Sequence, residues 1–305
     1  MGIAQTRRQK NALHAARGRN ARFSRETLRT GLHVQQEESN TMRVIIQENY
    51  EKMCHWAAWH IASRINSHTR KTPFVLGLPT GSSPVGVYKE LIQMNRQGSV
   101  SFSHVVTFNM DEYVGLPHEH EQSYWHFMHQ HFFDHLVDMN KENIHILNGM
   151  AEDPEKECAD YEALIQSCGG IDLFLGGIGV DGHIAFNEPY TSLRSRTGLR
   201  TLTAETRLVN SRFFDNDPQK VPTHALSVGV GTVTDAREVV LLVNGHQKAR
   251  ALSATVEGGI SQKWTCSALQ MHDNAIIVCD EAACGELKVD TYKYFLDVEK
   301  AQRLP

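Results

Sequence analysis

The 305-residue sequence lacks any apolar run that could cross a membrane. Its longest runs, such as Val239–Val243, are far shorter than the roughly 18 residues that a membrane span needs. It also lacks a large excess of charge of either sign. The net charge is −4, which gives no case for binding nucleic acid. With 41% hydrophobic and 22% charged residues, the chain is neither disordered nor collagen-like. We therefore expect a globular protein with no membrane or nucleic-acid partner.

Paired-cysteine motifs are also missing. None of the six cysteines belongs to a C-x-x-C pair, which argues against a zinc ribbon or a thioredoxin-type site. We expect no secretory signal, because residues 1–41 contain no apolar core segment. Cys54, Cys168 and Cys279 lie in or beside apolar stretches. We interpret the cysteines as buried, reduced thiols of an intracellular and cytoplasmic protein.

Basic residues are concentrated at the start of the chain. Residues 1–41 carry a net charge of +5, which leaves −9 on the remaining 264 residues. This arginine-rich composition suits an organellar transit peptide. It suits equally a disordered leader, or translated sequence ahead of a start at Met42. Since apolar periodicity begins only after Met42, we predict a basic leader over residues 1–41 and a single catalytic domain over residues 42–305.

Short apolar runs rich in β-branched residues alternate with helical patterns along the body. The predicted strands are Arg43–Gln47, Phe74–Leu78, His104–Asn109, Ile171–Gly176, Ala225–Val230, Glu238–Val243 and Ala275–Cys279, and the predicted helices are Lys52–Ser67, Gly86–Met94, Asp153–Ser167 and Lys248–Val256. Most of these runs are continuous rather than alternating, as in strands that are buried on both faces. We predict an α/β fold in which helices cover both faces of a mostly parallel sheet.

In such sheets, ligands bind beyond the carboxyl ends of the strands. The first strand end with unusual residues is the segment from Leu78 to Pro84, which contains Thr80, Gly81, Ser82 and Ser83. Its small residues and hydroxyls precede a predicted helix, so backbone N–H groups and the helix N-terminus can bind an anion. A plain tight turn with a serine cap is the alternative. The segment is not a Walker A loop, because it lacks the Gly-Lys-Ser/Thr ending.

The second strand end carries the adjacent acids Asp111 and Glu112. These carboxylates are candidates for proton transfer, although a solvated acid at the start of a loop would look the same. Because successive strand residues point to opposite faces, we expect only one of the two to face the cleft.

The third strand end is the glycine-rich segment from Gly176 to Pro189. Three of its glycines fit the dinucleotide pattern G-x-G-x-x-G, but no long apolar helix follows, so we predict no dinucleotide cofactor here. Asp181, His183 and Glu188 stand within eight residues of one another. An imidazole exchanges protons near neutral pH, and flanking carboxylates can orient it. Packing alone does not explain three ionisable groups in such a short loop.

The fourth strand end places Lys248 at the start of a predicted helix. A cation is disfavoured at a helix N-terminus unless an anion offsets it, so Lys248 is a candidate phosphate ligand, with an ordinary exposed lysine as the alternative. Arg212, which stands beside two phenylalanines, is a second candidate cation.

Six histidines lie between His118 and His135. His131 and His135 are four residues apart and could share a helix face as a metal pair. The aromatic residues between them favour an amphipathic core helix instead, and we predict no metal site.

Taken together, Leu-Pro-Thr-Gly at 78–81, Phe-Asn-Met-Asp-Glu-Tyr at 108–113, Asp-Gly-His-Ile-Ala-Phe-Asn-Glu-Pro at 181–189 and Gly-x-Gln-Lys at 245–248 resemble the glucosamine-6-phosphate deaminase family. The resemblance extends from Met42 to about Glu299. It implies a Rossmann-like sheet and the conversion of glucosamine 6-phosphate and water to fructose 6-phosphate and ammonia. It also implies a sugar-phosphate ligand and chemistry that needs no metal or redox cofactor.

The resemblance assigns a role to each motif. His183 would act on the ring oxygen to open the pyranose, supported by Asp181 and Glu188. Asp111 would move the C2 proton towards C1. The residues that would bind the phosphate are Thr80, Gly81, Ser82, Ser83, Arg212 and Lys248.

Some members of the family are hexamers that N-acetylglucosamine 6-phosphate activates at an intersubunit site. By resemblance we expect a homo-oligomer, with a hexamer as its form. The corresponding allosteric candidates here are Thr191, Ser192, Arg200 and Tyr294. The pattern is incomplete, because Gly198 stands where the family has a basic residue.

Two other readings fit parts of the sequence. One is a sugar-phosphate lactonase or aldose–ketose isomerase on the same scaffold, which Asp111 beside Asn109 disfavours. The other is a non-catalytic sugar-phosphate sensor, which would need an N-terminal DNA-binding helix-turn-helix. Residues 1–41 are too short for one and lack apolar periodicity.

The incomplete allosteric pattern gives a first prediction. Losing one guanidinium–phosphate pair weakens effector binding by about 1.5–3 kcal/mol. We therefore expect N-acetylglucosamine 6-phosphate to activate this chain weakly or not at all. Steady-state kinetics with and without the effector measure this, and a large fall in the half-saturating substrate concentration would contradict it.

Overall fold

The computed structural model describes residues 41–304. The predicted leader over residues 1–41 therefore lies outside the described residues, except for Thr41. No helix among residues 41–304 combines the length and the apolar character that a membrane crossing requires.

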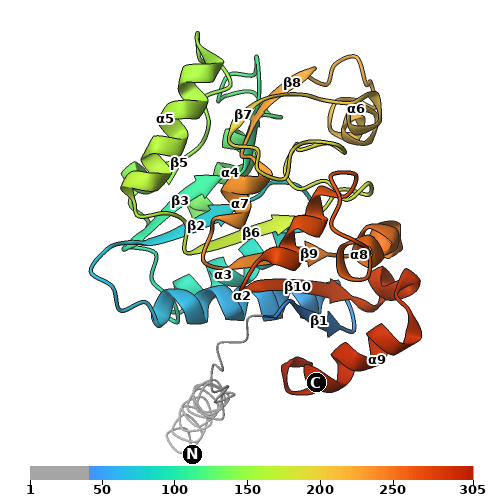
Figure 1. The fold of residues 1–305 in the computed structure, drawn as a ribbon. Coiled ribbons are helices and arrows are strands. Elements are labelled where there is room, and N and C mark those ends of the chain that lie inside the picture. Colours follow the sequence, from blue (N-terminus) through green and yellow to red (C-terminus); the bar gives the residue numbers. More distant parts are fainter. Residues whose placement is uncertain (1–40, 305) are drawn as a thin grey trace, which may run out of the picture. The chain divides into compact units, whose positions relative to one another are not determined.

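A seven-stranded sheet forms the centre of the described chain (Figure 1). In sheet order its strands are β1 (Arg43–Gln47), β10 (Ala275–Asp280), β9 (Val239–Val243), β6 (Leu173–Gly177), β2 (Phe74–Leu78), β3 (Val105–Asn109) and β5 (Ile144–His145). Every neighbouring pair in this sheet is parallel. The predicted fold class is confirmed.

Helices cover both faces of this sheet. The α-helices are α2 (Tyr50–Asn66), α3 (Val85–Arg96), α4 (Tyr124–His131), α5 (Pro154–Ser167), α6 (Ala204–Asn210), α7 (Val230–Thr234), α8 (Ala249–Val256) and α9 (Val289–Val298). In Figure 1, α2 and α3 lie below the sheet, and α5 and α7 lie above it. Alternate residues of each strand join two separate cores: Leu76 packs with α2 and α3, whereas Val75 packs with α5, α7 and α8. This two-sided burial explains why the strands are continuous apolar runs.

A second, three-stranded antiparallel sheet has the order β4 (Asp111–Tyr113), β8 (His224–Ser227) and β7 (Gly198–Thr201). The prediction of a strand over Ala225–Val230 was therefore wrong in two ways. The strand ends at Ser227 and belongs to this small sheet, and the chain then enters α7 at Val230. Neither β4 nor β7 was predicted, because strands of three and four residues carry too little pattern.

The strand order reverses between β2 and β6, which are neighbours in the sheet. From β2 the chain proceeds through β3 to β5 at one edge, and from β6 it proceeds through β9 and β10 in the other direction. A crevice forms at such a reversal, because the connections on either side leave in opposite directions. All four strand ends that the sequence singled out belong to the adjacent strands β9, β6, β2 and β3.

The pairing of β2 with β6 depends on a glycine. Gly77 lies opposite Phe174 in the register, and a Cβ at Gly77 would stand 2.6 Å from the Phe174 ring. The phenylalanine therefore fills the volume that any side chain at residue 77 would need.

We predict that Gly77→Ala destabilises the protein by about 1–3 kcal/mol, the usual cost of overpacking a core. The measurement is the melting temperature by circular dichroism. Gly259→Ala is the matched control, because a Cβ at Gly259 would meet no atom within 4 Å. An equal effect of the two substitutions would contradict the packing argument.

Candidate active site

The four strand ends meet around a single cavity of about 350 Å³. Nine of the ten predicted catalytic and substrate-binding residues line it: Thr80, Gly81, Ser82, Ser83, Asp111, Asp181, His183, Arg212 and Lys248. The tenth, Glu188, lies behind His183. The cavity is within the usual size range of a small-molecule site, and it lies at the strand-order reversal where a parallel sheet binds its ligands.

The loop from Pro79 to Pro84 forms one wall of the cavity and leads directly into α3. Two tyrosines fix its shape. The Tyr50 hydroxyl donates to the carbonyl oxygens of Ser82 and Ser83 at 3.1 and 3.2 Å, and it accepts from the Gly86 amide at 3.0 Å. The buried Tyr88 hydroxyl donates to the Pro79 carbonyl. A loop held in this way can present its amides and hydroxyls to an anion with little reorganisation.

The two candidate cations both face this cavity. Lys248 ends the 3₁₀ helix η4 (His246–Lys248) at the start of α8, and its Nζ donates to the Ile178 carbonyl. Burial lowers the pKa of Lys248 to about 8, with Asp181 opposing the shift and Arg212 adding to it. The Arg212 guanidinium lies 4.6 Å from the centre of the Phe213 ring. A bound phosphate would offset the cost of bringing both cations into one cavity.

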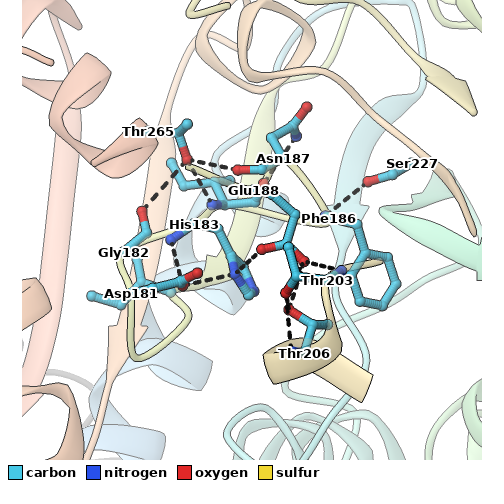
Figure 2. Close-up of polar contacts among 12 residues, drawn as sticks. Asp181, Gly182, His183, Phe186, Asn187, Glu188, Thr203, Thr206, Ser227 and Thr265 are labelled. Atoms are coloured by element: carbon cyan, nitrogen blue, oxygen red, sulfur yellow. Dashed lines mark hydrogen bonds and ion pairs between the residues drawn. The ribbon is translucent and has the colours of Figure 1, made fainter. Parts of the chain in front are cut away.

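His183 lies between two carboxylates (Figure 2). Its Nδ1 is 2.8 Å from Asp181 Oδ1 and 3.7 Å from Glu188 Oε2. Burial opposes ionisation of Asp181, but the interaction with His183 outweighs it and keeps the pKa of Asp181 below 3.8. Because both acids approach the same ring nitrogen, Nε2 is the nitrogen left for a ligand.

The glycines around His183 have a steric function. A Cβ at Gly179 would stand 2.5 Å from both the imidazole and the Asp181 carboxylate. The chain therefore needs glycine here for a close side-chain approach, not for a pyrophosphate. No helix follows this segment before α6, which agrees with our rejection of a dinucleotide motif.

Glu188 is held by two threonines that the sequence did not indicate. Its Oε1 accepts from the Thr206 hydroxyl at 2.5 Å and from the Thr203 hydroxyl at 3.3 Å (Figure 2). These threonines stand at the start of α6, so Glu188 connects this helix to the His183 ring. Figure 2 also shows Thr265 bonded to the backbone of the same loop, which fixes the path from Gly182 to Asn187.

The acids Asp111 and Glu112 separate as expected. Asp111 lines the cavity, whereas Glu112 points into the protein and accepts from the amides of Tyr113, Tyr124 and Trp125 at 2.8–2.9 Å. Glu112 therefore holds the start of α4. Burial, with a smaller contribution from the Glu112 charge, raises the pKa of Asp111 to about 8. Within residues 41–304, no hydrogen bond to the Asp111 carboxylate is found.

Comparison with known proteins agrees with this geometry. Residues 48–278 match the family described as glucosamine-6-phosphate isomerases/6-phosphogluconolactonase. A glucosamine-6-phosphate deaminase from Phocaeicola vulgatus is 64% identical over 262 residues, which are 85% of this chain and 99% of that protein. One from Parabacteroides distasonis is 60% identical over 87% of this chain and 98% of its own length.

This chain belongs to the glucosamine-6-phosphate deaminase family.

One solved structure supports the same family, and a second shows the same fold. A protein described as a monomeric glucosamine-6-phosphate deaminase is 39% identical, covers 80% of this chain and 99% of its own, and has a TM-score of 0.77. A 6-phosphogluconolactonase from Thermotoga maritima covers 79% of this chain and all of its own with a TM-score of 0.64, but at 16% identity it shows the fold alone.

The allosteric candidates lie away from the cavity. Thr191, Ser192, Arg200 and Tyr294 do not line it, and within the described range no hydrogen bond joins Tyr294 to the other three. The Arg200 guanidinium lies 2.8 Å from where a Cβ at Gly198 would stand and donates to the Arg196 carbonyl at 2.6 Å. Arg200 therefore occupies the space beside Gly198, where the family pattern has a basic residue.

The two histidines considered as a metal pair do not share a helix, because α4 ends at His131 and His135 belongs to the 3₁₀ helix η1 (Phe133–His135). The expected amphipathic helix is correspondingly short. Among residues 41–304, one group of three side chains has ligand atoms close enough to share a cation, namely Asp181, His183 and Glu188 within 4.8 Å. An imidazolium between two carboxylates has the same arrangement.

All six cysteines are free, and five of them are buried. Their burial agrees with the prediction for five of the six, whereas Cys168 is partly exposed.

The raised pKa of Asp111 predicts a pH-dependent stability. Its folded-state pKa of about 8 lies above the ordinary 3.8, so ionising Asp111 costs stability as the pH rises from about 4 and the cost is complete above about 8. Asp111→Asn should therefore melt at the same temperature as the native chain near pH 4. Near pH 9 it should melt at least about 2 °C higher.

Differential scanning calorimetry at several pH values provides the measurement. The exposed Asp273 makes no side-chain contact within the described residues, so Asp273→Asn should show no such difference. An unchanged or lower melting temperature for Asp111→Asn at pH 9 would contradict the raised pKa.

Proposed function

We propose that this chain converts glucosamine 6-phosphate and water to fructose 6-phosphate and ammonia. One observation carries the proposal: a buried base, Asp111, shares a cavity with His183 and with two cations beside a polar loop. The relatives at 60–64% identity that carry the name glucosamine-6-phosphate deaminase support the same activity.

The phosphate would bind the loop from Thr80 to Ser83 together with Arg212 and Lys248. The donors come from the β2–α3 loop, the 3₁₀ helix η3 (Ser211–Phe213) and the start of α8. Because these elements are distant in sequence, the phosphate position is fixed by the fold. Holding this remote group places C1 and C2 of the sugar against the catalytic side chains.

Ring opening is the first chemical step. His183 Nε2 would deliver a proton to the ring oxygen while water takes the proton of the C1 hydroxyl, and the bond between C1 and the ring oxygen breaks to give the open-chain aldehyde. Asp181 and Glu188 near Nδ1 stabilise the charged form of the imidazole and fix its direction.

Isomerisation and hydrolysis follow. The Asp111 carboxylate would take the proton from C2 while the substrate ammonium gives a proton to the C1 oxygen, which forms an enolamine. Asp111 would then return its proton to C1. This leaves an imine at C2, which water attacks, and ammonia leaves as the C2 carbonyl of fructose 6-phosphate forms. A carboxylate with a pKa of about 8 is a stronger base than an exposed one, and this suits abstraction of a carbon-bound proton.

The lactonase and sensor readings have weaker support. The lactonase from Thermotoga maritima is 16% identical, which supports the scaffold but not the chemistry. We further propose that the domain over residues 42–305 acts in the cytoplasm as a homo-oligomer. The 39% identical deaminase that is described as monomeric weakens the case for a hexamer, so light scattering on the purified chain is the test.

Ammonia release from glucosamine 6-phosphate tests the activity directly. We expect the native chain to release one ammonia per fructose 6-phosphate. Asp111→Asn should lose at least about 10³-fold in kcat, within the usual range for a general base, with substrate binding by calorimetry nearly unchanged. No ammonia from the native chain would refute the proposed function, and near-normal turnover of the variant would remove Asp111 from its role.

The shifted pKa values of Asp111 and Lys248 also predict a narrow pH profile of kcat/KM. Asp111 must be ionised to act as a base, so kcat/KM should fall as the pH decreases below about 8. Lys248 must be protonated to bind phosphate, so kcat/KM should fall as the pH rises above about 8. The maximum should therefore lie near pH 8.

The Lys248→Arg variant separates the acidic and alkaline limbs of this pH profile, because a guanidinium stays protonated. We expect this variant to lose part of its activity but to keep the acidic limb and move the alkaline limb upwards. The substrate amine titrates equally with both proteins, so the difference between them isolates Lys248. An alkaline limb that is identical in the two proteins would contradict its assignment.

A further inference from the structure

A second hollow lies outside the active site, between α3 and the segment formed by α4 and η1. It is an open groove of about 520 Å³. The residues that line it are Lys89, Ile92, Gln93, Arg96, Gln97, Gln130, His131 and His135. None of them lines the active-site cavity, so the two hollows are separate.

The groove has cationic side chains and no carboxylate. Lys89 and Arg96 supply the positive charge, and within residues 41–304 neither of them forms an ion pair. The acids next to the lining residues are engaged elsewhere: Glu90 pairs with His55 at 3.1 Å and Asp134 pairs with His129 at 2.8 Å. The positive charge of the groove is therefore left without an acidic partner among residues 41–304.

Two histidines also line the groove beside these cations. Burial, together with Lys89, His135 and His126, lowers the pKa of His131. His135 Nε2 lies 2.9 Å from the Gln130 carbonyl, so this nitrogen donates and Nδ1 faces Arg96 at 3.5 Å. Lys89 thus disfavours a positive charge on His131, and an anion in the groove would offset this repulsion.

The spacing of the cations indicates the size of the ligand. Lys89 and Arg96 are two turns apart on one face of α3, which is a rise of about 10 Å along the helix. A single phosphate is short for this span, whereas linked phosphate groups can approach both ends. The amides of Gln93 and Gln97 supply further neutral donors along the same wall, and Gln130 supplies one from α4.

We propose that this groove binds a small anion with linked phosphate groups. The site goes beyond the proposed function, since its ligand is neither the substrate nor the product of the reaction.

Both helices that form the groove begin at the active site. α3 starts directly after the loop that would hold the substrate phosphate, and α4 starts where Glu112 accepts the Tyr124 and Trp125 amides. Phe127 of α4 lines the active-site cavity, and its ring centre lies 4.5 Å from that of His131 in the groove. A ligand that draws α3 and α4 together would therefore alter the cavity wall, and occupancy of the groove should change the substrate affinity.

Calorimetric titration of the full chain with inorganic pyrophosphate tests the binding. We expect two sites, one of which is lost in Arg212→Ala and the other in Lys89→Ala/Arg96→Ala. The control Lys71→Ala/Lys293→Ala removes the same charge from two exposed lysines and should keep both sites. If the groove variant folds poorly by circular dichroism, Lys89→Gln/Arg96→Gln replaces it.

Loss of at least tenfold in affinity for one site in the groove variant alone supports the proposal. An unchanged titration, or an equal loss in the control, overturns it. Because the titration measures binding and needs no catalysis, its result does not depend on whether the proposed function is correct.

The effect on the active site rests on the proposed function and has its own test. Ammonia release is measured well below the half-saturating substrate concentration, with and without pyrophosphate, in the native chain and in the groove variant. Direct competition at the active site affects both proteins equally. We expect the responses of the two proteins to differ by at least twofold, and identical responses would overturn the connection between the sites.

Discussion

The burial of the Asp111 carboxyl is the constraint on which the rest of the site depends. β3 belongs to the large parallel sheet and β4 to the small antiparallel one, and Asp111 stands where the chain passes between them. Water is largely excluded there, since only 6% of Asp111 is exposed. A carboxylate without hydrogen-bond donors in such a place is costly, and the same cost makes it a strong base.

The neighbouring acids differ from Asp111 in how their negative charge is stabilised. Glu112 is also buried, and its pKa is raised to about 7 by burial, but three backbone amides offset part of the penalty. Asp181 has the opposite shift, because His183 stabilises its charge. Asp111 and Asp181 line the same cavity but differ in pKa: Asp111 is the more basic carboxylate, and Asp181 stays ionised beside His183. Local placement would also allow a body with a charge of −9 to bind a phosphate as proposed, because Arg212, Lys248 and the loop from Thr80 to Ser83 line the same cavity.

The sequence predicted the features that depend on local pattern. Strands such as β2 and β9 were found to within one residue, because burial on both faces leaves continuous apolar runs. Nine of the ten site residues line one cavity, because carboxyl ends of adjacent parallel strands converge. The sequence missed what depends on long-range contacts. Tyr50 of α2 contacts the loop between Pro79 and Pro84 from a distant part of the sequence, and the threonines that hold Glu188 lie 15 and 18 residues away from it. The hydrophobic periodicity of the sequence does not indicate such contacts.

The most direct test of the account is the pKa of Asp111 itself. Carbon-13 NMR of the chain labelled at aspartate carboxyls, with the Asp111→Asn spectrum to assign the signal, follows its titration from pH 4 to 10. The account predicts a titration near pH 8 in the ligand-free protein. A titration near 4, the ordinary value for an exposed aspartate, would contradict the claim that burial makes Asp111 the base.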